Sequence, residues 1–162
     1  MSKTIPVPPI SCAFVLDIDM LVVEMFHNIL TDYCKRFKTE ITDEYDRIVF
    51  CGIDTGTSKE WKGLTTMADN GTIHVQIQDP WLMHYDCNPF TVQMAVTILA
   101  HEMVHVCQYL TDNKGFKSKI TYDKMDEDEA YFFDPQEMQA YMLENLYTVK
   151  YGKALKEYGE NF

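Results

Sequence analysis

Long apolar runs and paired cysteines are what this sequence lacks most clearly. No stretch approaches the roughly 20 consecutive apolar residues that a membrane-spanning helix needs, and the first residues do not form the apolar core of a signal peptide. We therefore expect a cytoplasmic protein with no membrane partner. The 5 cysteines are scattered and never spaced as C-x-x-C, which argues against a disulfide framework and against a thiolate zinc knuckle.

Positive charge is also scarce. The chain has 14 Lys and Arg residues against 25 Asp and Glu residues, so its formal net charge at pH 7 is -11. A charge of this sign repels a phosphate backbone, and no cluster of basic residues with interleaved aromatics compensates for it. We expect no nucleic-acid partner.

Apolar residues, in contrast, are sufficient for a core. The 162 residues are 46% hydrophobic, and no internal repeat or linker divides them, so we predict a single domain over residues 1–162. Residues 17–38 carry apolar side chains at the spacing of one helical face. Three runs rich in β-branched residues predict strands at residues 47–53, 64–67 and 72–78. Asn70-Gly71 between the last two runs is a strong hairpin signal.

The longest predicted helix spans residues 90–110 and contains neither Gly nor Pro. One of its faces is an apolar stripe formed by Val92, Val96, Leu99, Met103, Val106 and Leu110. The opposite face is also apolar around His101 and His105, so the helix is expected to be buried inside the domain. Further helices are predicted from Asp134-Pro135 to about Val149 and after Gly152. The predicted fold class is α+β, with a small twisted sheet packed on helices.

The segment His101-Glu102-Met-Val-His105 has the pattern H-E-x-x-H. Residues four apart on an α-helix project from one face, so both imidazoles can bind the same metal ion. A zinc ion with three protein ligands keeps one position for water and lowers the pKa of that water to about 7. A glutamate beside the first histidine can then take the proton, which assigns Glu102 the role of general base.

A catalytic zinc ion needs a third protein ligand, and His105 is the last histidine of the chain. Glu137 is the best downstream candidate because it lies in the first turn of a regular helix. Asp134-Pro-Gln-Glu137 also fits an N-cap with a capping-box glutamate, so a purely structural role remains open. The other downstream carboxylates are Asp134, Glu144 and the acidic run of residues 126–129, and the run is more typical of a solvated loop.

His101-Glu-Met-Val-His105, followed after a polar connection by Asp134-Pro-Gln-Glu-Met-Gln-Ala140, resembles the gluzincin branch of zinc metallopeptidases, particularly its compact single-domain members. The resemblance covers about residues 72–145. It implies a zincin-like fold, one Zn2+ held by His101, His105 and Glu137, Glu102 as base, and cleavage of a peptide or protein substrate. It also implies an edge strand on which an extended substrate lies, and residues 72–78 would be that strand.

The pattern departs from the family at one position. Many gluzincins place an aspartate four residues after the ligand glutamate to orient the first histidine, and here that position is Tyr141. The outer partner of His101 is therefore unassigned. Tyr131 and Tyr141 are candidates for stabilising an oxyanion, although aromatic core packing is the more common role.

Two other classes of protein fit parts of the pattern. A ferritin-like di-iron site would use the two E-x-x-H pairs, Glu24 with His27 and Glu102 with His105, but it needs four long helices where this sequence predicts strands. A zincin-like domain could instead bind metal as an interaction module without turnover. The intact Glu102 argues against that second alternative.

Overall fold

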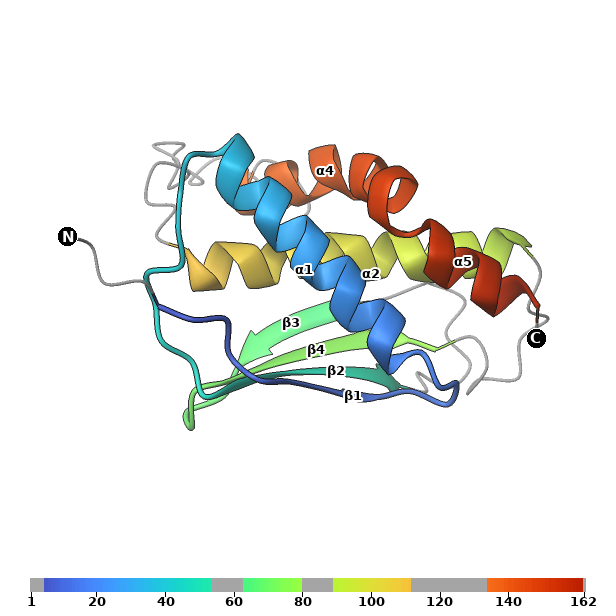
Figure 1. Cartoon of the computed structure of the whole chain (residues 1–162), viewed down its shortest axis with the longest axis horizontal. Coiled ribbons are helices and arrows are strands. Elements are labelled where there is room, and N and C mark those ends of the chain that lie inside the picture. The colour runs from blue at the N-terminus through green and yellow to red at the C-terminus, as the bar shows by residue number, and fades with distance from the viewer. Residues whose placement is uncertain (1–4, 54–62, 80–88, 112–133, 162) are drawn as a thin grey trace, which may run out of the picture.

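The computed structural model describes residues 5–53, 63–79, 89–111 and 134–161. Within these residues the chain forms an α+β domain with a mixed four-stranded sheet and four helices (Figure 1). The elements follow in the order β1 (Ile10–Ala13), α1 (Asp19–Arg36), β2 (Arg47–Ile53), β3 (Gly63–Met67), β4 (Thr72–Gln78), α2 (Pro89–Leu110), α4 (Pro135–Tyr151) and α5 (Lys153–Glu160). The predicted α+β class and the predicted helices and strands are confirmed, with boundaries shifted by a few residues.

The strand order across the sheet is β1-β2-β4-β3. β1 pairs with β2 and β2 pairs with β4 in parallel, whereas β3 is antiparallel to β4. The chain passes from β1 to β2 through α1, which is the crossover that two parallel neighbouring strands require. β4 is therefore an internal strand, and β3 lies at the end of the described sheet.

The hairpin between β3 and β4 forms where Asn70-Gly71 predicts it. Gly71 has a φ of +82°, a conformation that residues with a Cβ rarely adopt. The Asn70 side chain accepts a hydrogen bond from the Thr72 amide at 3.1 Å, and the Ala68 amide donates to the Thr72 carbonyl at 2.9 Å. These contacts fix the register in which Met67 lies opposite Ile73.

The helices cover one face of the sheet, and α2 lies between the sheet and α4 (Figure 1). Every residue of the apolar stripe predicted on α2 is buried. The matching face of α1 is buried as well, through Val22, Met25, Phe26, Ile29, Leu30 and Tyr33. No helix among the described residues has the length and apolar character needed to cross a bilayer.

Two features of the sheet differ from the sequence-based expectations. The prediction missed β1, a four-residue strand that follows Pro8 and Pro9 and that exists through its pairing with β2. The prediction that residues 72–78 form the edge strand is wrong, because β2 covers the side of β4 opposite β3. Both errors have one cause: strand order depends on long-range pairing, which local periodicity does not encode.

Polar side chains form hydrogen bonds between α4 and α1. The Asp32 carboxylate of α1 accepts hydrogen bonds from the hydroxyls of Tyr147, at 2.8 Å, and Tyr151, at 3.2 Å, both on α4. Arg36 forms an ion pair with the same carboxylate at 3.0 Å. These contacts fix the position of the helix that carries Glu137.

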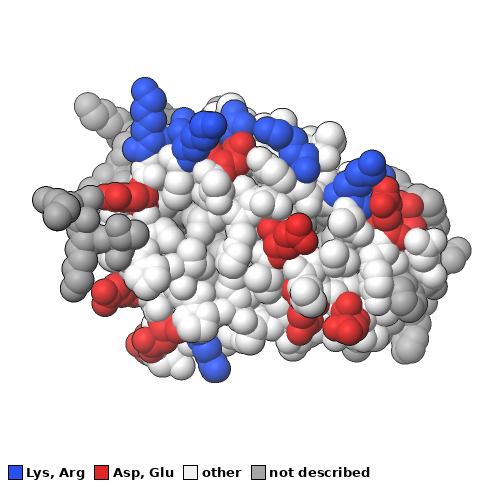
Figure 2. Space-filling view, viewed as in Figure 1, with Lys and Arg blue, Asp and Glu red and all other residues white. Residues whose placement is uncertain are grey.

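Basic side chains gather along the helical edge of the molecule, over the end of α1 and over α5, in the view of Figure 2. Four of them lie within 4.0 Å of a carboxylate: Arg36, Lys150, Lys153 and Lys156. Arg36 and Lys150 share the carboxylate of Asp32, so these four cations lie beside three carboxylates.

Candidate metal centre

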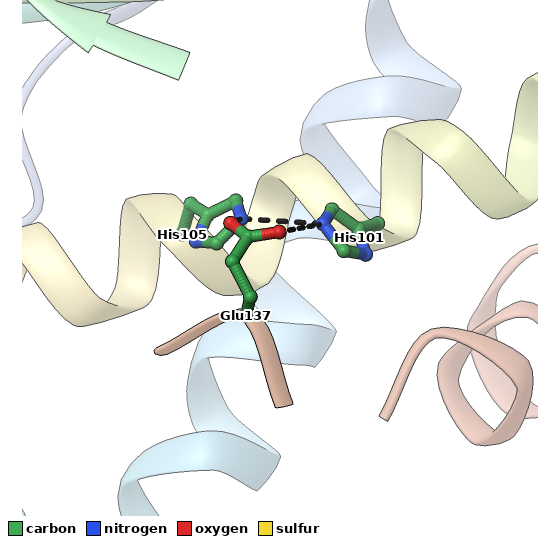
Figure 3. A group of neighbouring side chains, drawn as sticks. All are labelled: His101, His105 and Glu137. Atoms are coloured by element: carbon green, nitrogen blue, oxygen red, sulfur yellow. Dashed lines mark hydrogen bonds and ion pairs between the residues drawn. The ribbon is translucent and has the colours of Figure 1, made fainter. Parts of the chain in front are cut away.

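Helix α2 places His101 and His105 one turn apart, with their rings beside each other at the α2–α4 contact (Figure 3). The two Nε2 atoms are 3.2 Å apart. Both side chains are largely shielded from solvent, with 9% and 13% of their surface exposed. The apolar stripe on the other side of α2 causes this burial, because it fixes the rotation of the helix against the sheet and α1.

Helix α4 brings the third candidate, Glu137, to the same point (Figure 3). Its Oε1 lies 2.6 Å from Nε2 of His105, and its Oε2 lies 3.4 Å from Nε2 of His101. The N-cap of α4 is Asp134, whose side chain accepts hydrogen bonds from the amides of Gln136 and Glu137. Capping thus falls to Asp134, while the carboxylate of Glu137 faces the two histidines.

The two histidine nitrogens are spaced as two ligands of one zinc ion would be. Zinc–nitrogen bonds of about 2.0–2.1 Å at a tetrahedral angle separate two ligand nitrogens by roughly 3.3 Å, close to the spacing of the two Nε2 atoms. One ligand atom from each of the three residues lies within 4.8 Å of the others. Two imidazoles and one carboxylate are a donor set that suits a divalent metal ion.

Each histidine has a hydrogen-bond partner on the ring nitrogen that faces away from this point. Nδ1 of His101 is 2.9 Å from Oε2 of Glu144, and Nδ1 of His105 is 2.8 Å from Oε1 of Gln108. Such partners orient ligand histidines and select their tautomer. Sequence reasoning did not assign either residue to this role. The available signal for Glu144 was its position seven residues, or two helical turns, after Glu137 on the same face of α4.

Tyr141 lies one turn after Glu137 on α4. Its ring packs edge-on against His101, with 4.6 Å between the ring centroids, and the residue is 40% exposed. Tyr141 therefore covers the centre from the solvent side and is not a core residue. Tyr131 and the acidic run of residues 126–129 lie outside the described residues.

Glu102 points toward β3, on the other side of α2 from Glu144. The hydroxyl of Thr65 donates a hydrogen bond to its Oε2. A Cβ on Gly63 would lie 2.8 Å from Cγ of Glu102 and 2.7 Å from Ile98, so only glycine allows this close approach of strand and helix. An open cleft of about 300 Å³ lies between β3, α2 and the start of α4, and Glu102, His105 and Glu137 line it.

The carboxylates around the histidines determine the charge state of the metal-free site. Burial lowers the pKa of His101, but hydrogen bonds to Glu137 and Glu144 outweigh that effect and raise the pKa to about 9. The pKa of His105 is raised for the same reason, with Glu137 as its main partner. Burial raises the pKa of Glu102, against the opposing effect of its hydrogen bond to Thr65.

The residues of the alternative di-iron site do not form one metal-ligand group in the described part of the chain. Glu24 and His27 are exposed on α1, and the metal-ligand group found among the described residues consists of His101, His105 and Glu137 alone.

Neither family models, nor curated protein sequences, nor solved structures give a significant match to this chain. The chemistry of the site therefore has to be argued from its own residues.

Replacing Glu144 by Gln tests its contact with His101. The change keeps the shape of the side chain but removes the charge that favours a hydrogen on Nδ1, so zinc affinity should fall about 10–100-fold. Competition with a chelator measures this loss. The exposed Glu157 of α5 provides the control, because Glu157→Gln makes the same chemical change away from the site. Equal zinc affinities for the two variants would contradict the role of Glu144.

Proposed function

We propose that this protein is a zinc-dependent peptidase with a zincin-like fold, similar to the compact gluzincins. The observation that supports it most strongly is the convergence of His101, His105 and Glu137 at one point, with Glu102 beside them at the wall of an open cleft. The first three residues would hold the zinc ion. Glu102 would act on the substrate without binding the metal.

The proposed reaction is hydrolysis of a peptide bond. A zinc ion in this site would supply Lewis acidity, which polarises the substrate carbonyl and lowers the pKa of water. Glu102 takes a proton as water adds to the carbonyl carbon. It then passes that proton to the amine nitrogen as the carbon–nitrogen bond breaks. Thr65 holds the Glu102 carboxylate at the cleft throughout these steps.

The position of β3 supports an extended peptide as substrate. β3 is the terminal strand of the described sheet, and residues 63–65 form one wall of the cleft next to Glu102. An extended chain that adds to β3, on the edge that no other described strand covers, would run past the candidate metal site. The proposal therefore places the substrate beside β3 and not beside residues 72–78, which lie inside the sheet.

Metal content and turnover test this proposal together. We expect purified protein to bind one zinc ion and to hydrolyse members of a peptide library only in the zinc-loaded form. Two iron ions per chain would contradict the proposal. One zinc ion without hydrolysis of any peptide would favour the non-catalytic metal-binding module.

Glu137→Gln separates the ligand role of this residue from the capping role. If Glu137 only capped the helix, Gln would replace it with little effect, because an amide can also reach the cap. As a ligand it loses a charged donor, so we expect zinc affinity to fall by more than the 10–100-fold typical of an outer partner. Chelator competition measures the affinity, and thermal unfolding of both metal-free proteins controls for capping. Unchanged affinity would return Glu137 to a structural role.

A further inference from the structure

Gln108 connects three elements around the candidate site. Its Oε1 lies 2.8 Å from Nδ1 of His105, one turn earlier on α2. Its Nε2 donates to the main-chain carbonyl of Gln136 at 2.9 Å and to Oε1 of Gln139 at 2.7 Å, both on α4. One side chain thus contacts a candidate ligand on α2 and the peptide group just before the candidate ligand Glu137 on α4.

The carbonyl of Gln136 determines which way the Gln108 amide points. A main-chain carbonyl can only accept a hydrogen bond, so the Gln108 atom facing it must be the NH2 group. The oxygen of Gln108 then faces Nδ1 of His105 and can only accept. Nδ1 must therefore carry a hydrogen, which leaves the lone pair of a neutral imidazole on Nε2, the atom that faces Glu137.

A buried hydrogen bond from α1 supports this orientation. Oε1 of Gln139 accepts from Nε2 of Gln108 and also from the hydroxyl of Tyr33, at 2.9 Å. Tyr33 is completely buried in the core and Gln139 is 4% exposed. The NH2 group of Gln108 needs an acceptor, so the Gln139 atom that faces it is the oxygen, and the Tyr33 hydroxyl donates a second hydrogen bond to that same oxygen.

We propose that Gln108 is a positioning residue that keeps His105 in the tautomer with hydrogen on Nδ1, and that Gln139 and Tyr33 hold Gln108 in the required orientation. This inference rests on the proposed metal site. It extends the site through the amides of Gln108 and Gln139 to α1, whose Tyr33 is part of the hydrophobic core. The spacing between His105 and the start of α4 depends on the same hydrogen bonds.

Two variants test this series of hydrogen bonds at different distances from the candidate metal site. Gln108→Leu removes the acceptor for His105, and we expect zinc affinity to fall about 10–100-fold. Tyr33→Phe keeps the ring in the core and removes only the remote hydroxyl, so the expected loss is on the order of fivefold, as for one hydrogen bond. Gln93→Leu is the control, because Gln93 lies on α2 and bonds Thr97 instead of the site.

The tautomer of His105 can also be measured directly. Long-range 1H–15N spectra of the zinc-loaded wild type should show a slowly exchanging proton on Nδ1 of His105, and Gln108→Leu should make its exchange fast. Zinc affinity and proton exchange equal to those of Gln93→Leu would overturn the inference, even if the wild type binds zinc. Failure of the wild type to bind zinc would instead overturn the proposed function. The two failures are thus distinguishable.

Discussion

Glu102→Gln should abolish peptide hydrolysis while leaving zinc bound. Glu102 is assigned to proton transfer and not to the metal, so the change removes the base and none of the three candidate ligands. Loss of a general base lowers the rate by about 10²–10⁴-fold. The amide oxygen of Gln can still accept the hydrogen bond from Thr65, so the local packing should persist. The measurement is kcat/KM on a responsive peptide, with zinc stoichiometry determined on the same preparation.

Glu24→Gln is the matched control for this experiment. It makes the same chemical change at an exposed position of α1, and Glu24 is also the residue that a di-iron site would have used. We expect wild-type activity from Glu24→Gln. Activity of Glu102→Gln equal to that of the control would refute the role of Glu102, and loss of zinc from Glu102→Gln would mean that the residue acts on the metal itself.

His101→Ala or His105→Ala should lose zinc together with the stabilisation that zinc provides. Each change removes one of three candidate ligands, and an ion that binds only the folded chain stabilises it by about 2.7 kcal/mol at a concentration 100 times Kd. Thermal unfolding should therefore show a rise in Tm with zinc for the wild type and no rise for either variant. Direct metal analysis gives the stoichiometry.

His27→Ala controls for the loss of any histidine, since His27 lies on the exposed face of α1. Its Tm should respond to zinc as that of the wild type does. Comparison of the metal-free proteins separates the loss of packing from the loss of metal. Stoichiometric zinc on purified His101→Ala or His105→Ala would rule out the proposed site.

Local sequence patterns determined the elements and the first part of the site. The buried faces of α1 and α2 follow from apolar spacing, because a helix repeats every 3.6 residues whatever it packs against. The hairpin follows from Asn70-Gly71, since Gly71 needs a positive φ. The juxtaposition of His101 and His105 follows from their spacing of four on one helix. Each of these features involves residues close in the chain.

The tertiary structure decided the features that join distant segments. The positions of β1 and of β3 at the edge of the sheet depend on the pairing of β2 with β4, which no local pattern specifies. The sequence alone left two roles open for Glu137, metal ligand or helix cap. The packing of α4 on α2 places its carboxylate next to His105. The same packing brought Glu144 to His101 and Gln108 to Gln139. A polar side chain forms such a hydrogen bond only when another element brings a donor or acceptor within hydrogen-bond distance. That distance is set by the packing of the apolar faces of the elements against one another.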